Sequence, residues 1–334
     1  MPKWPKIIIG VTIFIELLAI FFLARIIRIK LSSENNILGI SVTPLKKENF
    51  LFPQDSELKY FYEPKPDTTQ TEERTWFNSD ITYTINSDAL NERYNYSIEK
   101  PPDTFRIIAL GDSFTFGSLV NTRDTWPEKL EDLLNEHTGC KQQQKFEVIN
   151  LGVGGYDVAY IAQRYKARGQ KYSPDLILWL ESGTGFENIN ELIIPRMTKY
   201  AKDRDLGFKQ YEIKEDDYYP IATQALNDIK KIYGEDTLLT QIRGAWNDFF
   251  EMRGDIPILI APLLSIPKER VTLLDSWIQN YKNITIYNEL PDIYSLRVVF
   301  PDGHPTAEGQ LLIAKSMYAY INNSNLIPCI LSSQ

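Results

Sequence analysis

Short apolar runs alternate with amphipathic stretches along the second two-thirds of this chain. Runs of four to seven residues rich in Ile, Leu and Val are typical of strands buried on both faces of a parallel sheet. Strands that alternate with helices predict an α/β domain whose parallel sheet has helices on both faces. The predicted strands are 107–110, 148–151, 174–180, 256–261 and 284–287, and the clearest predicted helices are 237–250, 268–281 and 311–321.

The first apolar run leads into the sequence RIIALGDSFTFG, which spans Arg106–Gly117. The strand ends at Gly111, and Ser113 follows two residues later. In open α/β sheets, reactive groups gather beyond the carboxyl ends of the strands, so Ser113 stands where a nucleophile is expected, ahead of a helix that starts near Asp124. A hydroxyl is a weak nucleophile at its own pKa and needs both a base and donors for the developing oxyanion.

The chain has only two histidines from which this base can come. His137 lies at a polar helix end, where an imidazole interacts favourably with the helix dipole. His304 lies in a loop that opens onto the amphipathic helix Leu311–Ile321, with Thr306 as a candidate cap. Asp302 precedes His304 by two residues and can orient its imidazole. Taken alone, this loop also fits an ordinary Asp-Gly turn with a surface histidine.

Together, the serine and histidine motifs give the chain a specific resemblance. Gly111-Asp112-Ser113 near the start of the domain and Asp302-Gly303-His304-Pro305 near its end resemble the SGNH (GDSL-type) hydrolase superfamily of esterases, lipases and carbohydrate O-deacetylases. The resemblance covers roughly residues 104–323. It implies a flavodoxin-like three-layer α/β/α fold with a five-stranded parallel sheet, a serine nucleophile, a late histidine base and an oxyanion hole.

The resemblance assigns roles to individual residues. Ser113 matches the nucleophile, whose amide also serves the oxyanion hole, and His304 matches the base. Asp302 matches the acid at a shorter spacing, because the superfamily more often places this aspartate three residues before the histidine and here it lies two before. A Ser-His dyad with an indirect role for Asp302 therefore stays open.

A glycine-rich turn follows the second predicted strand and resembles the block that supplies the oxyanion glycine. Gly155 aligns best with that glycine, while Gly152 and Gly154 would serve the turn. Glycine suits the role because it allows close backbone approach to the reacting carbon and a positive φ. Taken alone, such a cluster also fits a simple strand-to-helix connection.

The block that should supply the oxyanion asparagine departs from the superfamily. After the third predicted strand the chain reads ESGTGFEN over 181–188, and Thr184 occupies the expected asparagine position. Three outcomes follow: Thr184 donates instead, Asn188 reaches back from the next turn, or the hole lacks one donor. Loss of one donor typically lowers the rate by on the order of 100- to 1000-fold.

The segment Glu187–Glu235 is longer than a plain crossover needs, and we expect it to form a wall over the substrate site. Its aromatic side chains predict either a cover for the domain edge, which we favour, or a sugar-stacking platform. They are Tyr200, Phe208, Tyr211, Tyr218 and Tyr219, and the acids beside them are Glu212, Glu215, Asp216 and Asp217.

The first 30 residues predict an N-terminal membrane anchor. The run Ile7–Ala24 is just long enough to cross a hydrocarbon core of ~30 Å, although Glu16 costs roughly 2.5 to 3.5 kcal/mol on insertion scales. No small-residue cleavage site follows it, which favours an uncleaved single span. Basic residues flank both sides and lean slightly toward a cytoplasmic domain. We nevertheless expect an extracytoplasmic domain, because a lone anchor before a hydrolase resembles a secreted enzyme kept at the membrane.

Residues 31–103 form the second predicted region, between the anchor and a hydrolase domain at 104–325. Its linker-like core at 63–70 is rich in Pro and Thr, and Ile81–Asp88 alternates with period two and then turns. This pattern predicts a small β-hairpin subdomain docked on the hydrolase.

The amino-acid composition limits the classes of partner and cofactor that we expect for this protein. A net charge of -8 and a pI near 5.1 argue against nucleic acid and give no reason to expect binding to anionic lipid by charge. Cys140 and Cys329 fit either two free thiols or one disulfide. No dinucleotide or phosphate-loop motif is present and histidine is too scarce for a conventional zinc site, so no metal or cofactor is predicted.

These observations predict a membrane-anchored serine esterase of the SGNH type that removes O-acyl or O-acetyl groups from a glycan or lipid. Two other functions remain open. The first is acyl transfer to a cell-envelope polysaccharide, which differs only in what deacylates the serine. The second is a non-catalytic binding or scaffold protein that kept the fold and lost the asparagine donor.

Overall fold

The computed structural model describes residues 49–55, 57–74, 77–137, 145–204, 215–324 and 326–327. They all lie in one compact unit, Ile40–Gln334. The predicted membrane span at 7–24 and both cysteines lie outside the described residues. Within the described ranges, no helix is long and apolar enough to cross a membrane.

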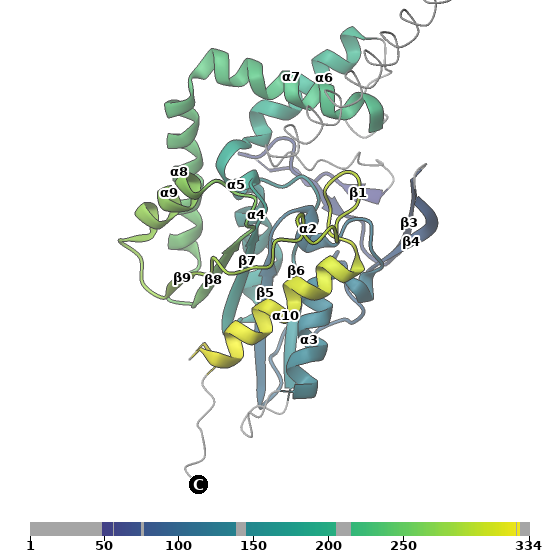
Figure 1. The fold of residues 1–334 in the computed structure, drawn as a ribbon, viewed down its shortest axis with the longest axis vertical. Coiled ribbons are helices and arrows are strands. Elements are labelled where there is room, and N and C mark those ends of the chain that lie inside the picture. The colour runs from purple at the N-terminus through teal and green to yellow at the C-terminus, as the bar shows by residue number, and fades with distance from the viewer. Residues whose placement is uncertain are drawn as a thin grey trace, which may run out of the picture. The chain divides into compact units, whose positions relative to one another are not determined.

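A five-stranded, all-parallel sheet forms the centre of the molecule (Figure 1), as the apolar runs predict. Its strand order is β6-β5-β7-β8-β9, so the chain steps to one side of β5 and then returns past it. The three central strands are buried along their whole length. The strands are β5 (Thr104–Leu110), β6 (Lys145–Asn150), β7 (Leu176–Glu181), β8 (Ile258–Pro262) and β9 (Ile284–Ile286).

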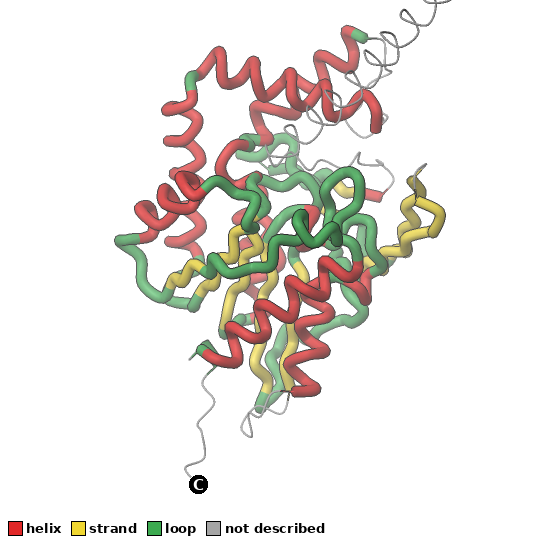
Figure 2. Tube along the Cα trace, viewed as in Figure 1, coloured by secondary structure: helices red, strands yellow, loops and turns green. Residues whose placement is uncertain are grey.

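Helices cover the sheet as an α/β arrangement requires. α3 (Trp126–His137) and α10 (Ala307–Asn323) lie side by side over β5 and β6 (Figures 1 and 2). α4 (Val158–Arg164) packs against α8 (Glu235–Met252), and right-handed crossovers place this pair on the other face. The remaining pieces near the sheet are α2 (Ser113–Phe116), η2 (Thr122–Asp124), η3 (Tyr165–Gly169), η4 (Gln170–Tyr172), α5 (Thr184–Glu187) and α9 (Lys268–Ile278).

Aromatic packing fixes α8 against the sheet. Trp179 of β7 is fully buried and its ring lies 4.4 Å from that of Trp246 and 4.9 Å from that of Phe249. Large buried rings of this kind dominate the apolar area that a core removes from water. The central strand β7 and the loop that follows it are therefore held rigidly.

The segment 187–235 forms a helical pair, α6 (Asn190–Asp203) and α7 (Glu215–Tyr233), that lies at the top of the view in Figure 1. The pair has its own small core, which includes Ile193, Met197 and Leu226. The Tyr200 hydroxyl donates to Asp228 across the pair, so this tyrosine ties two helices together. Of the other predicted aromatics, Phe208 and Tyr211 lie outside the described residues, as do the side chains of Tyr218 and Tyr219.

An antiparallel hairpin lies before the sheet begins, but its bounds differ from the prediction, because β-strands include residues 63–64 and 68–70 of the predicted linker-like core and the strand expected over 81–88 ends at Ile85. Its strands are β3 (Thr68–Arg74) and β4 (Phe77–Ile85), paired antiparallel, and a second short pair joins β1 (Phe50–Leu51) to β2 (Glu63–Pro64). The Leu119 amide donates to the Tyr83 hydroxyl at 2.8 Å. The hairpin therefore packs on the loop that follows α2.

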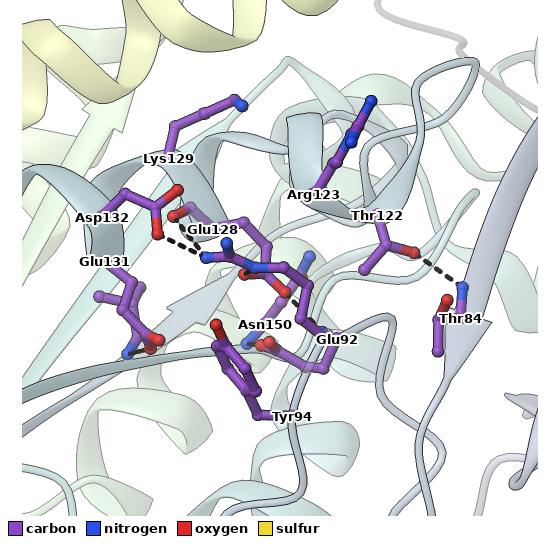
Figure 3. Close-up of polar contacts among 12 residues, drawn as sticks. Thr84, Glu92, Tyr94, Thr122, Arg123, Glu128, Lys129, Glu131, Asp132 and Asn150 are labelled. Atoms are coloured by element: carbon purple, nitrogen blue, oxygen red, sulfur yellow. Dashed lines mark hydrogen bonds and ion pairs between the residues drawn. The ribbon is translucent and has the colours of Figure 1, made fainter.

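A charged network joins residues 92–96 to α3 (Figure 3). Arg93 pairs with Glu128 and also contacts Asp132 at 2.7 Å. The Glu92 carboxylate accepts from the Asn150 amide at the end of β6. Residues upstream of the sheet are thus bound to α3 by ion pairs and to the edge strand β6 by a hydrogen bond.

Candidate active site

Ser113 lies at the topological switch point of the sheet. The chain leaves β5 for β6 on one side and later places β7 on the other, and such a reversal opens a crevice at the carboxyl ends of the strands. Ser113 is the first residue of the four-residue helix α2, which the sequence pattern did not predict. Asp112 caps this helix by accepting from the Phe114 amide at 3.0 Å. The serine is fully buried.

His304 and Asp302 form a direct pair. The His304 ring nitrogen Nδ1 lies 2.9 Å from the Asp302 carboxylate, which also accepts from the His304 amide at 3.2 Å. The histidine is 1 % exposed. The two-residue spacing therefore lets the Asp302 carboxylate reach the imidazole directly. This geometry gives no reason to treat Ser113 and His304 as a dyad without Asp302. The predicted cap is also present, because the Thr306 hydroxyl accepts from the Gly309 amide.

Gln310 fastens the histidine loop and helix α10 to the serine segment. Its side chain donates to the Phe114 carbonyl at 3.1 Å and accepts from the Trp126 amide at 2.8 Å. The Phe114 ring lies 5.3 Å from the His304 ring. The structure thus brings His304 against the residue that follows Ser113. Gln310 is fully buried, and no sequence signal pointed to this role, because Gln310 lies just before the predicted helix Leu311–Ile321.

The glycine-rich turn after β6 lies directly against Ser113. A Cβ on Gly154 would come 3.7 Å from the Ser113 Cβ, and a Cβ on Gly152 would clash with the Phe116 amide at 2.3 Å. Gly155 has a φ of +78°. Its buried amide donates to no acceptor among the described residues. A buried amide usually has a partner, so this one is suited to receive an oxyanion.

Thr184 lies beside Asp112, the residue before the serine, and its hydroxyl is already engaged. It donates to the Asp112 carboxylate at 3.3 Å, and the Ser182 hydroxyl donates to the same oxygen. Burial raises the pKa of Asp112, and the bonds from Ser182 and the Phe114 amide oppose that rise. A threonine hydroxyl has one hydrogen, so Thr184 gives up its bond to Asp112 if it donates elsewhere.

Asn188 is the C-cap residue of α5, and it lies two residues before Asn190, whose side chain contacts the glycine-rich turn. It is 6 % exposed, and its side-chain amide has no hydrogen-bond partner among the described residues. Two residues later, the Asn190 side chain donates to the Gly155 carbonyl at 2.8 Å. The segment 188–190 therefore runs beside the glycine turn. Asn190 was missed by the sequence analysis, because nothing in its surroundings distinguishes it from other loop asparagines.

Glu181 organises the turn between β7 and α5. Its carboxylate accepts from the amides of Gly183 at 2.7 Å and Gly185 at 3.0 Å. Burial raises its pKa to about 7, and the two amide bonds oppose the rise. A Cβ on Gly185 would come 2.3 Å from this carboxylate. The glycines of ESGTGFEN thus fit around a buried acid. Across the described part of the chain, no three His, Cys, Asp or Glu side chains converge in a metal-binding group.

Comparison with known proteins gives structural matches only. No protein-family model and no curated protein matches this chain. A protein described as lipolytic and of the G-D-S-L family, from Desulfitobacterium hafniense, is similar with 18 % identity and a TM-score of 0.33, covering 64 % of this chain and 98 % of its own. A psychrotrophic esterase, EstA from Pseudoalteromonas, has 15 % identity and a TM-score of 0.39, with coverages of 65 % and 99 %.

A family 3 carbohydrate esterase from Clostridium thermocellum is also similar, with 14 % identity, a TM-score of 0.35 and coverages of 65 % and 95 %. At this level of similarity, the roles of residues in this chain rest on its own motifs and geometry.

Proposed function

We propose that this protein is a serine ester hydrolase of the SGNH type with Ser113, His304 and Asp302 as its catalytic residues. The observation that carries the proposal is the assembly of one buried site from three distant motifs. The glycine turn lies against Ser113, and the paired Asp302 and His304 pack on Phe114. An ordinary surface turn at 300–305 would not bury a histidine and its carboxylate together.

The reaction that follows from this arrangement is a two-step acyl transfer to water. Ser113 Oγ attacks the ester carbonyl while His304 accepts its proton. The new bond joins Oγ to the acyl carbon, and the alcohol leaves with that proton. Water then attacks the acyl-serine and His304 takes a proton from it. The bond between the acyl carbon and Oγ breaks, His304 returns the proton to Ser113 Oγ, and the carboxylic acid is released. Asp302 orients the imidazole through Nδ1 and stabilises its charged form.

The amides of Ser113 and Gly155 are the proposed backbone donors to the oxyanion. Asn188 is the proposed third donor, and Thr184 instead orients Asp112. Hydrogen-bond accounting favours this division, because the Thr184 hydroxyl already has an acceptor and the side-chain amide of Asn188 has none among the described residues. Such preorganised donors commonly supply the largest single contribution to acyl-transfer catalysis.

An O-acetyl group on a glycan is the proposed substrate, with an acylated lipid as the other candidate. Support comes from the resemblance to carbohydrate O-deacetylases and from the predicted anchor at 7–24, which would hold the enzyme beside envelope material. Incubation of the full chain with an O-acetylated polysaccharide should release acetate. Acetyl groups transferred to an added glycan acceptor, without free acetate, would instead identify an acyltransferase.

A serine-reactive fluorophosphonate separates both enzymes from a binding protein. The probe should label the wild-type chain and leave Ser113→Ala unlabelled. A wild-type chain that stays unlabelled would favour the non-catalytic scaffold.

A further inference from the structure

Tyr62 reaches the glycine turn from the part of the chain that precedes the sheet. Its hydroxyl donates to the Gly154 carbonyl at 2.6 Å. Its ring is 3 % exposed and packs edge-on to Tyr156 at 5.2 Å. Tyr62 lies one residue before β2, outside the segment that carries the SGNH motifs. Nothing in the serine, glycine or histidine blocks points to it.

The bond to Gly154 matters because that carbonyl and the Gly155 amide belong to one peptide unit. No cis peptide bond occurs in the described chain, and in a trans peptide the C=O and N–H point in opposite directions. A hydroxyl that holds the Gly154 carbonyl on one side therefore aims the Gly155 amide at the other side. This amide is the proposed oxyanion donor.

The glycines themselves do not fix this orientation. Rotation of the peptide changes only the ψ of Gly154 and the φ of Gly155, and glycine adopts positive and negative φ about equally readily. A Cβ on Gly154 would stand 3.7 Å from the Ser113 Cβ, an ordinary contact distance, so the turn lies against the serine. Two glycines in succession leave the donor peptide with little steric restraint, so the restraint has to come from a neighbour.

Tyr62 is itself held in place. The Tyr156 hydroxyl donates to the Tyr62 carbonyl, and Glu63, the next residue, is buried between Arg164 and Arg168. On the far side of the turn, Asn190 holds the Gly155 carbonyl at 2.8 Å. The peptide before Gly155 and the peptide after it are thus each fixed by one side-chain hydrogen bond.

We propose that Tyr62 is a positioning residue that sets the oxyanion amide of Gly155 through the Gly154 carbonyl. This inference rests on the proposed function. It assigns part of the catalytic apparatus to residues 61–64, which the sequence analysis placed in the linker region.

Tyr62→Phe tests the proposal because it removes the hydroxyl and keeps the ring. Hydrolysis of p-nitrophenyl acetate by the full chain is measured per serine titrated by a fluorophosphonate, so that misfolded molecules do not count. The kcat should fall about 10- to 100-fold, less than for complete loss of a donor, since the freed peptide still samples the productive orientation. The KM should stay within about twofold and the midpoints of the pH profile should not move.

Tyr172→Phe is the matched control. Tyr172 is also buried, and its hydroxyl makes one hydrogen bond, to Asp88 at 2.8 Å, before the amino end of β7. It should keep its kcat even if its Tm falls as far as that of Tyr62→Phe. An unchanged kcat in Tyr62→Phe, or an equal fall in both variants, would overturn the role of Tyr62. Failure of the proposed function would look different, because wild type and Ser113→Ala would then hydrolyse the ester equally.

Discussion

Asp302, whose carboxylate is buried, is the residue whose role the sequence left most open. Its contact of 2.9 Å with His304 Nδ1 fixes which ring nitrogen carries a proton, so Nε2 is the proposed base. Asp302→Asn keeps the shape but offers an amide in place of the carboxylate. We expect kcat to fall by about 10³- to 10⁴-fold, the size of effect seen when a triad acid is replaced by its amide.

The measurement is the pH-independent kcat with p-nitrophenyl acetate. Asp292→Asn is a suitable control, because the Asp292 carboxylate also accepts hydrogen bonds within its own loop, from the amide and the hydroxyl of Ser295. If Asp302→Asn retains more than a tenth of the wild-type kcat, Ser113 and His304 act as a dyad, and Asp302 stabilises only the conformation of its own loop.

Asn188 and Thr184 differ in whether their side-chain donors already have a hydrogen-bond acceptor among the described residues. Asn188→Ala should lower kcat by on the order of 100-fold if it supplies the third oxyanion donor. Thr184→Val should lower it about tenfold, since it removes one of two hydroxyls that orient Asp112. The comparison of these two kcat values at saturating ester decides the assignment. A larger loss in Thr184→Val would make the threonine the donor.

At the scale of elements, the interface between α3 and β6 contains a titrating acid. Glu131 of α3 accepts from the Val148 amide and the Tyr96 hydroxyl, both at 2.8 Å, and burial raises its pKa from 4.5 to about 7. The folded state therefore binds this proton more tightly than the unfolded chain does. Its contribution to stability is full below about pH 4.5 and is lost as the pH rises through 7.

Thermal unfolding should accordingly show a lower Tm at pH 8 than at pH 5.5. Asp157 and Glu181, whose pKa values burial raises to about 6 and about 7, act in the same direction. Glu131→Gln should reduce the pH dependence by about 1 to 3 kcal/mol of unfolding free energy. The exposed Glu289→Gln should leave it unchanged. A Tm that rises with pH in wild type would contradict this reading of Glu131.

The elements were predictable to different degrees for physical reasons. Strands β5, β7 and β8 follow from apolar runs, because they are buried along their whole length. Helices α8 and α10 follow from helical periodicity. Helix α2 was missed since four residues are too short to show a period. The helix starts at the Asp112 cap, and in the sequence alone an aspartate at this position is equally consistent with a turn.

The residues of the site were also predictable to different degrees. Ser113, His304 and Asp302 stand in motifs, so the sequence predicts them. Tyr62, Asn190 and Gln310 contact the site through side-chain hydrogen bonds to backbone groups far along the chain, and only the folded structure reveals such pairings. Thr184 illustrates the reverse, because its position matched a donor while its hydroxyl serves Asp112.

For the whole molecule, the predicted span at 7–24 leads to a localisation that is simple to measure. The full chain should stay with membranes after an alkaline carbonate wash and should dissolve in detergent, as an integral protein does. A variant with two further charges near the centre of the span, Ile13→Arg and Leu17→Arg, should be lost from the washed membranes, because a charge at the centre of a span costs about 2.5 to 3.5 kcal/mol. Release of the wild-type chain by carbonate would contradict the anchor.

The most direct test of the account concerns the meeting of Ser113 and His304 in one site. Hydrolysis of p-nitrophenyl acetate is measured for the full chain, for Ser113→Ala, for His304→Ala and for the double variant. Each single variant should lose about 10³-fold or more in kcat, and the double variant should be no worse than either, since the two side chains act as a unit. Equal rates in all four proteins would contradict the account.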